Sequence, residues 1–239
     1  MNTRELVNYL QGLAENNNRA WFVMNKPSYD ILRGEFTQLV AQVIEATARF
    51  DAPVAGQDPK KAQFRINRDI RFAKDKSPYK TNFSAVIAPG GKKDPGSHYY
   101  FHVDHHGNLL VAGGCYMPPA DVLAKIRACI AGDPAGFGKL LGSKRLWSHF
   151  GQFADEGRLV RPPKGFAPDT PYIDYIKQKS FIVWTETPVK GLDAKALTRQ
   201  IADGFQRSLP LILWLREATA PVPVAPAKAR KGRSGAAKA

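Results

Sequence analysis

The spacing of apolar residues predicts helices at both ends of the chain. Leu6, Leu10 and Leu13 recur at helical intervals near the start. A second apolar stripe extends from Tyr29 to Phe50, and a third follows a helix that we expect from about Asp193 to Arg216. Shorter helical patterns occur at 122–129, 134–150 and 171–178. Both ends of the protein should therefore be helical.

The middle of the chain alternates apolar and polar residues with a period of two, which is typical of half-buried strands. This pattern covers 64–72, further strand candidates follow at 81–88, 98–105 and 108–116, and a strand-like segment, SFIVWTET, begins at Ser180. Short turn-forming connections favour antiparallel hairpins. We therefore predict a single α+β domain over residues 1–218, in which N-terminal and C-terminal helices pack on a central, mostly antiparallel sheet.

Residues 219–239 form a tail rich in Ala, Pro and Lys with no apolar pattern to bury, and we predict that it is disordered. The chain of 239 residues carries a formal net charge of +14, and five of its basic groups, with no acid, lie in this tail. An excess of this sign attracts polyanions. Nucleic acid is thus a possible partner, held mainly non-specifically through the tail.

The two cysteines of the chain are too few for a secreted disulfide framework, so we expect a cytoplasmic protein. The longest apolar runs fall well short of the ~20 residues that span a bilayer, and no membrane span is expected. Common nucleotide, hydrolase and zinc motifs are absent from the sequence. We therefore predict no cofactor and no metal, and the sequence gives no indication of oligomeric state.

One residue breaks the alternation in the basic segment 64–83. Arg68 falls on the same strand face as Phe64, Ile66 and Ile70. If that face is buried, the guanidinium needs a carboxylate of the protein or a bound anion, because an unpaired buried charge costs several kcal/mol. A β-bulge near Asn67 would instead move Arg68 to the other face.

The same segment is dense in groups that bind phosphate or carboxylate. Arginine supplies a planar fork and lysine a point charge. The candidate ligand-binding residues are Arg65, Arg68, Arg71, Lys74, Lys76, Tyr79 and Lys80, with Arg19 and Lys26 as contributors from an earlier helical segment. Two alternatives remain: an internal ion-pair network with Asp69 and Asp75, and solvated surface charge.

A catalytic role would require a base beside these cations, and Asp69 and His102 are the candidates. His102 and Asp104 share one strand face and could chelate a metal only with help from elsewhere in the chain. Three converging ligands are not visible in this segment, which agrees with the prediction of no metal site.

Three long strings show a resemblance to a known family: NNNRAWFVMNKPSY (16–29), FRINRDIRFAKDKSPYKTNF (64–83) and GGKKDPGSHYYFHV (90–103), the last followed by YMPP. Together they resemble the widespread uncharacterised family catalogued as domain of unknown function 2461, over roughly residues 3–216. The resemblance implies a cytosolic single-domain protein and brings no established reaction. The positions most characteristic of the family are Asn18, Arg19, Trp21, Phe22, Asn25, Lys26, Arg65, Arg68, Asp69, Arg71, Lys74, Asp75, Lys76, Pro78, Tyr79 and Lys80.

Four functions remain open from the sequence. The leading hypothesis is a protein that binds a phosphate- or carboxylate-bearing small molecule through the Arg/Lys cluster. The alternatives are an enzyme acting on a phosphoryl or other anionic substrate, a nucleic-acid-associated protein that uses its basic surface and tail, and a structural or partner-binding protein whose basic residues pair with internal acids.

Overall fold

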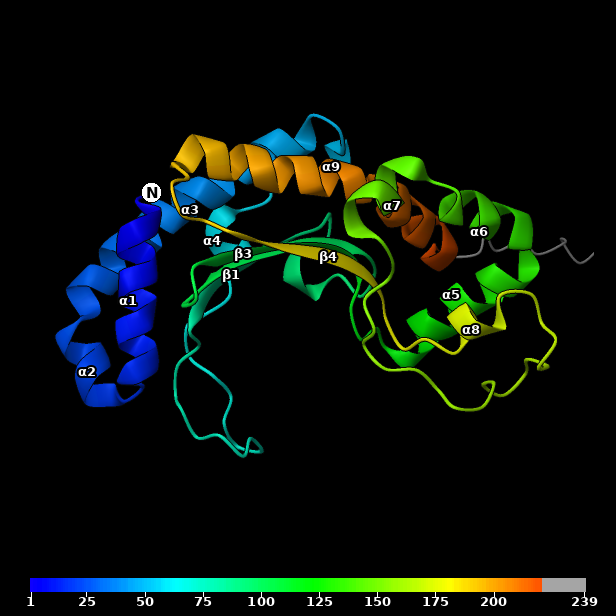
Figure 1. Ribbon diagram of the computed structural model, residues 1–239, viewed down its shortest axis with the longest axis horizontal. Coiled ribbons are helices and arrows are strands. Elements are labelled where there is room, and N and C mark those ends of the chain that lie inside the picture. Colours follow the sequence, from blue (N-terminus) through cyan, green and yellow to red (C-terminus); the bar gives the residue numbers. More distant parts are fainter. Residues whose placement is uncertain (221–239) are drawn as a thin grey trace, which may run out of the picture.

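Four strands form one antiparallel sheet whose spatial order follows the chain: β1 (Asn82–Ile87), β2 (His98–Asp104), β3 (Asn108–Cys115) and β4 (Phe181–Pro188) (Figure 1). The computed structural model describes residues 1–220. The strands predicted at 81–88, 98–105, 108–116 and in SFIVWTET are confirmed. Each of the first two connections is short, which allows neighbouring segments to pair as hairpins.

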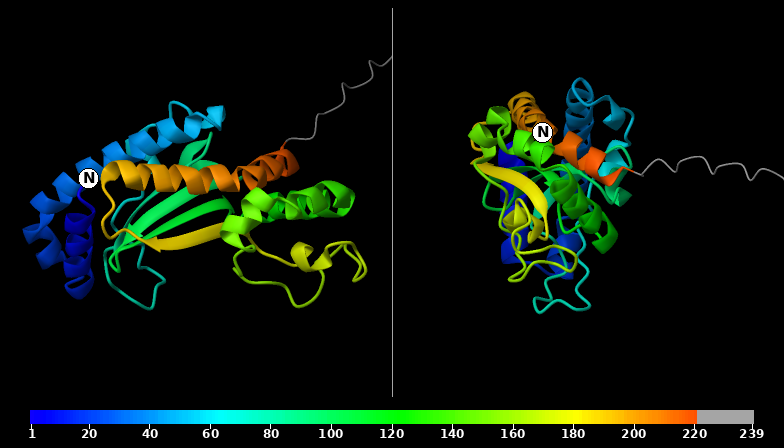
Figure 2. Two further views of the ribbon diagram at one scale, coloured as in Figure 1. Left: turned by 45° about the horizontal axis from the view of Figure 1, so that its top comes forward. Right: turned by 90° about the vertical axis from the view of Figure 1, so that its right-hand side faces the viewer.

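The two faces of the sheet differ in cover. The alternation places Phe83, Tyr99, Phe101 and Val111 on one face, where each is at most 3% exposed. The opposite face carries the residues next to these along each strand, among them Tyr100, which lies across from Ala112 in the register of β2 and β3. Helices lie on the first face and leave the second one uncovered (Figures 1 and 2).

The long helices on the covered face are α3 (Lys26–Ala48) and α9 (Ala194–Thr219), which cross the sheet side by side (Figure 1). Before them come α1 (Thr3–Glu15) and α2 (Arg19–Met24). Side-chain caps fix the starts of α2 and α9: Asn18 Oδ1 accepts from Trp21 N at 3.0 Å, and Asp193 Oδ1 accepts from Ala196 N at 2.7 Å. The predicted α+β arrangement, with helices from both ends on the sheet, is confirmed.

The remaining elements are short. They are η1 (Ala52–Val54), α4 (Pro59–Ala62), η2 (Gly91–Lys93), α5 (Ala120–Gly132), α6 (Pro134–Leu141), α7 (Lys144–Phe150) and α8 (Ile173–Ile176). The last four gather beside the C-terminal half of α9, so that the described part of the molecule extends beyond both ends of the sheet (Figure 1). In residues 1–220 no helix is both long and apolar enough to cross a membrane.

Two apolar clusters hold these layers together, and α9 contributes to both. Its residues Leu197, Ile201 and Phe205 join the cluster between the sheet and α1 and α3, whereas Leu211 and Leu215 join a second cluster with α5, α6, α7 and the start of β4. All five side chains are fully buried. Burying such a side chain contributes roughly 1.5–3 kcal/mol, so α9 joins the two halves of the described structure strongly.

The predicted strand at 64–72 is wrong. Only isolated bridges form there, between Gln63 and Ala85 and between Asn67 and Tyr79. The segment leaves the edge of β1, turns, and returns against itself, as the Arg68 N to Pro78 O hydrogen bond of 2.9 Å shows. Because β1 begins only at Asn82, no strand of the sheet lies beside most of this segment to pair with it. We call residues 64–81 the basic arm, which projects from the sheet in Figure 1.

The predicted tail at 219–239 lies outside the described residues except for its first two positions. Of these, Thr219 is the last residue of α9.

Candidate functional site

Arg68 is half-buried, and its positive charge is paired with a carboxylate of the protein. Its guanidinium donates to Asp75 and to the carbonyl of Ser77, the latter at 3.1 Å. The Ser77 hydroxyl, the Ser77 backbone N–H and then Arg68 hold the pKa of Asp75 well below its usual range. No bulge is needed, since the even positions remain the less exposed ones up to Ile70. At Arg68 the internal ion pair is therefore the arrangement that the structure adopts.

Charged side chains at the tip of the basic arm also pair with other groups of the arm. Arg71 donates to Asp69 through two hydrogen bonds of 2.9 and 2.7 Å, which lower the pKa of Asp69 and raise that of Arg71. Lys76 Nζ donates to the carbonyl of Ile70 at 3.0 Å, and Lys74 is exposed. The contacts of Arg71 and Lys76 stiffen the arm, since each closes part of its turn.

Arg19 and Lys26 lie apart from the arm pocket and the sheet cleft described below. Arg19 is exposed at the start of α2, and Lys26 donates to Asp30 one turn later in α3 at 2.6 Å. Neither lines these cavities. An exposed pair of this kind contributes at most about 1 kcal/mol.

A polar cavity, which we call the arm pocket, lies where the basic arm meets β1, and three sequence-predicted residues come together there. Its volume is about 430 Å³, and its lining includes Arg68, Tyr79, Lys80, Asp75, Ser77, Asn17, Thr81, Asn82 and His105. Tyr79 is buried and stacked on Phe22, with ring centroids 4.2 Å apart. Asn82 Oδ1 and His105 Nδ1 are buried without a hydrogen-bond partner. Because Asp75 balances Arg68, Lys80 is the one lining cation of this pocket without an ion-pair partner among residues 1–220.

Lys80 and three cations beside the arm pocket form a group that we call the basic quartet: Arg33, Arg65, Lys80 and Lys92. Lys80 Nζ and Lys92 Nζ lie 5.0 and 5.5 Å from the centroid of the Phe64 ring, and Arg33 lies 5.9 Å from that of Phe83. None of the four takes part in the seven ion pairs found in residues 1–220. The quartet is therefore a concentration of positive charge at the edge of β1.

Burial lowers the pKa of three of these groups, and neighbouring cations lower that of the two lysines further. Burial lowers the pKa of Lys80, and Arg65, Lys92 and Arg33 lower it further. Burial and then Arg33 lower the pKa of Lys92, whose Nζ donates to the carbonyl of Gln63 at 2.6 Å. Burial likewise lowers the pKa of Arg33. Each shift means that the folded protein disfavours the charged form of the group.

A second cavity, the sheet cleft, hollows the uncovered face of the sheet next to the quartet. It measures about 530 Å³ and is lined by Phe64, Val86, His98, Tyr100, His102, Leu110, Ala112, Tyr116, Glu156, Ile182 and Trp184. Phe64 and Tyr100 meet edge to face at 6.1 Å. Phe64 thus lines the cleft while two lysines of the quartet lie over its ring. Aromatic side chains thus make up much of the surface of the sheet cleft, and charged groups lie at its border.

The two candidate bases are not brought together. His102 lines the sheet cleft, where its Nδ1 lies 3.1 Å from the Tyr100 hydroxyl, whereas Asp69 belongs to the basic arm and binds Arg71. Burial lowers the pKa of His102 against the opposite effects of Asp104 and Glu186, so the ring is neutral at pH 7. Within residues 1–220, no group of three or more His, Cys, Asp or Glu side chains is placed to hold a metal ion.

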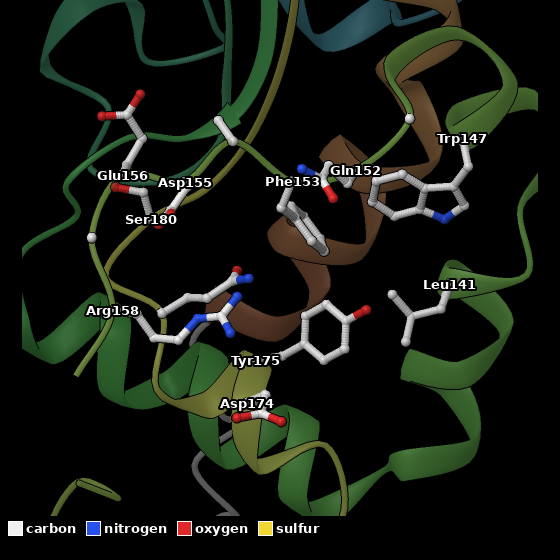
Figure 3. A pocket seen from close by; sticks show the side chains of 14 residues that line it. Leu141, Trp147, Gln152, Phe153, Asp155, Glu156, Arg158, Asp174, Tyr175 and Ser180 are labelled. Atoms are coloured by element: carbon white, nitrogen blue, oxygen red, sulfur yellow. The ribbon is translucent and has the colours of Figure 1, made fainter. Parts of the chain in front are cut away.

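A third cavity, of about 620 Å³, lies between α7, α8 and the segment 151–158 (Figure 3). Phe153, Arg158 and Tyr175 project into its middle, and Asp155, Glu156 and Asp174 surround them (Figure 3). Glu156 lines this cavity and the sheet cleft as well. The side chains that line the third cavity come from α6, α7, α8 and the connections at 151–158 and 178–180, and no site was predicted there.

Sequence reasoning missed half of the basic quartet. Arg65 and Lys80 were predicted, but Arg33 is on a helix and Lys92 in a hairpin connection, so no local pattern links them. The aromatic lining of the sheet cleft was also missed, although the alternation in HYYFHVD already separated Tyr100 and His102 from the buried Tyr99 and Phe101.

Comparison with known proteins gives a family but no function. No curated protein matches the chain. A crystal structure of an uncharacterized protein from Methanothermobacter thermautotrophicus is 15% identical over 73% of this chain and 99% of that chain, with a TM-score of 0.35, too low to support an argument. The family described as "Conserved hypothetical protein (DUF2461)" matches residues 5–214. The chain therefore belongs to the DUF2461 family.

Proposed function

We propose that this protein binds an anionic small molecule, bearing a phosphate or a carboxylate, at the basic quartet. The observation that carries the proposal is the gathering of Arg33, Arg65, Lys80 and Lys92 with no acidic partner within 4.0 Å among residues 1–220. Arg68, Arg71 and Lys76 now have a supporting role, because their contacts shape the arm that carries Arg65 and Lys80.

Like charges held close together destabilise the folded state unless an opposite charge balances them. The four cations come from α3, from both branches of the basic arm and from η2, so folding must bring them together against their repulsion. A bound anion would remove that repulsion and accept charge-assisted hydrogen bonds from the two guanidinium and two ammonium groups. Such a trade of stability for function is common at binding sites.

Thermal unfolding with added inorganic tripolyphosphate tests the proposal. We expect the midpoint to rise with ligand concentration, by the equivalent of ~2.7 kcal/mol at one hundred times Kd. Lys80→Met and Lys92→Met should each weaken binding about tenfold or more, since each removes a hydrogen bond to a charged group. Both variants should also be at least as stable as the parent without ligand, because the repulsion is reduced.

Matched controls come from the same segments. Lys93→Met changes the neighbour of Lys92 in η2, and Lys74→Met removes an exposed ammonium group of the arm that takes part in none of the ion pairs found in residues 1–220. Both should bind tripolyphosphate like the parent. Equal losses of tripolyphosphate affinity in the Lys92 and Lys93 variants would mean that general surface charge accounts for the binding. That result would contradict the proposal.

The lowered pKa of Lys80 predicts a pH dependence of stability, which provides a second test. Because the unfolded chain binds this proton more tightly, the free energy of unfolding should rise as pH increases from the lowered pKa toward the ordinary value of 10.5. Lys80→Met should flatten this rise. Saturating tripolyphosphate should do the same, since it restores the charged form, and its affinity should fall as pH passes through that range. An unchanged pH slope with ligand would place the anion away from Lys80.

A further inference from the structure

The uncovered face of the sheet presents aromatic rings to solvent. Trp184 is 42% exposed and Tyr116 53% exposed, and both line the sheet cleft with Tyr100 and Phe64. Helices α3 and α9 cover only the other face, while the basic arm and the segments around α8 project to either side of this one (Figures 1 and 2). Exposed aromatic side chains gathered in one cleft commonly mark a binding surface.

The register shows how a flat ligand would fit. Tyr100 on β2, Ala112 on β3 and Trp184 on β4 lie directly across from one another. Only the methyl group of Ala112 lies between the two aromatic residues in this row, although two strand spacings, about 9.6 Å, separate their backbones. A planar ring placed over this row contacts Trp184 and Tyr100 together, which favours stacking over the docking of a bulky, branched group.

The two sides of the cleft differ in charge. At the β1 edge, Phe64 N donates to Ser84 O at 2.9 Å, which places the basic quartet there. At the β4 edge, Ala154 N donates to Ile182 O at 2.9 Å, which places Glu156 near that strand. Three strand spacings, about 14 Å, separate these edges. A ligand that spans the cleft would meet cations at one end and a carboxylate acceptor at the other.

We propose that the ligand of the basic quartet is a nucleoside phosphate whose base lies in the sheet cleft. The phosphate binds at the quartet, the base stacks against Trp184, and Glu156 accepts a hydrogen bond from an amino group of the base. This inference rests on the proposed function. It goes beyond it by identifying the ligand as an aromatic base joined to a phosphate.

The chemistry of the lining favours a base over an acyl chain. Tyr100, His98 and His102 bring polar atoms among the rings, and Glu156 would face an alkyl group unfavourably. A heteroaromatic base has a flat apolar face for the rings and N–H groups for the carboxylate. Stacking of this kind tolerates different bases, so selectivity should come from Glu156.

Isothermal titration with ribose 5-phosphate, AMP and IMP tests the inference. AMP should bind about tenfold more tightly than ribose 5-phosphate, since stacking one base contributes about this much. Trp184→Leu should remove that gain and leave ribose 5-phosphate affinity unchanged. Glu156→Gln should reduce the preference for AMP, which has an amino group, over IMP, which lacks it. In the parent protein, AMP should quench tryptophan fluorescence, and the Trp184→Leu variant should lose this quenching.

The control variant is Trp147→Leu, which changes the tryptophan of the third cavity and should bind AMP like the parent. If ribose 5-phosphate and AMP bind equally well, the inference is wrong and the proposed function stands. If neither these nor tripolyphosphate binds, both are wrong. An AMP preference that survives in the Trp184 variant places the base elsewhere and overturns the inference. Binding that appears only with oligonucleotides also overturns it, in favour of a nucleic-acid strand.

Discussion

At the scale of single residues, Asp51 shows how a charge is tolerated inside this protein. Its carboxylate is 3% exposed and accepts two hydrogen bonds of 2.7 Å from Arg216 and one of 2.9 Å from the Tyr99 hydroxyl. The three groups join the segment after α3, the end of α9 and strand β2. Breaking a buried pair leaves a charge uncompensated, which is more costly than the pair is stabilising.

Asp51→Asn should therefore lower the free energy of unfolding by about 3 kcal/mol or more, because Arg216 loses its counter-charge. Urea denaturation would show the loss as a lower midpoint with an unchanged slope. The matched control is Asp203→Asn, which breaks the exposed Arg207–Asp203 pair on α9 and should cost at most about 1 kcal/mol. Similar losses in the two variants would contradict the role given to Asp51.

The sequence pattern predicted that the guanidinium of Arg68 would need a charge partner, but it did not fix which group that partner would be. The alternation correctly placed this guanidinium on the less exposed side, but its partner, Asp75, lies seven residues on, across a turn whose shape no local pattern fixes. The basic quartet was harder to predict still. Arg33 and Lys92 are separated from Arg65 by about thirty residues on either side, and only the packing of α3 and η2 at the edge of β1 brings them together.

At the scale of elements, the contact between α9 and β3 depends on two glycines. A Cβ atom on Gly204 would lie 2.7 Å from Val111 Cγ1, and one on Gly113 would lie 2.3 Å from Ser208 Oγ. The backbones of the helix and the strand therefore approach each other closely at both positions. This contact positions β3, whose other face carries Ala112 in the floor of the sheet cleft.

A pair of Gly→Ala substitutions isolates this effect. Gly204→Ala should destabilise the protein by about 1–3 kcal/mol because the methyl group overpacks against Val111. Gly34→Ala, at an exposed position of helix α3 where nothing packs within 4 Å of the new methyl group, should stabilise it by about 0.5–1 kcal/mol. Both changes improve helix propensity equally, so the difference in thermal midpoint reports packing alone. Two stabilised variants would show that α9 has room to move away from β3.

Elements with a complete periodic pattern were predicted well, and the one without a partner was not. The helices α3 and α9 carry apolar stripes and β2 alternates along its full length, while β1 and β3 are mostly buried runs bounded by turns. The segment 64–72 carries the same alternation, but only its beginning lies beside β1. Alternation records which side of a chain is buried, and it does not record whether a neighbouring strand exists to bond with.

At the scale of the whole molecule, the excess positive charge falls on two separate parts of the chain. The quartet concentrates four cations at one edge of the sheet, whereas Lys228, Arg230, Lys231, Arg233 and Lys238 follow the described residues with no acid among them. The described body still carries most of the excess, about +9 of the total of +14. Binding of a small anion and association with nucleic acid should therefore depend on different parts of the chain.

Replacing those five tail residues with Gln in the full-length chain would separate the two roles. Non-specific binding to a single-stranded oligonucleotide should weaken, and the slope of log affinity against log salt should become shallower by up to about 3.5, because each lost phosphate contact contributes about 0.7. Tripolyphosphate binding should stay unchanged, since the quartet is intact. The converse variant, Lys80→Met, should bind tripolyphosphate about tenfold or more weakly and keep most of the oligonucleotide binding. If the tail variant retained its full salt slope, the body would be the nucleic-acid-binding surface, and the uncovered sheet face beside the quartet would be the first place to examine.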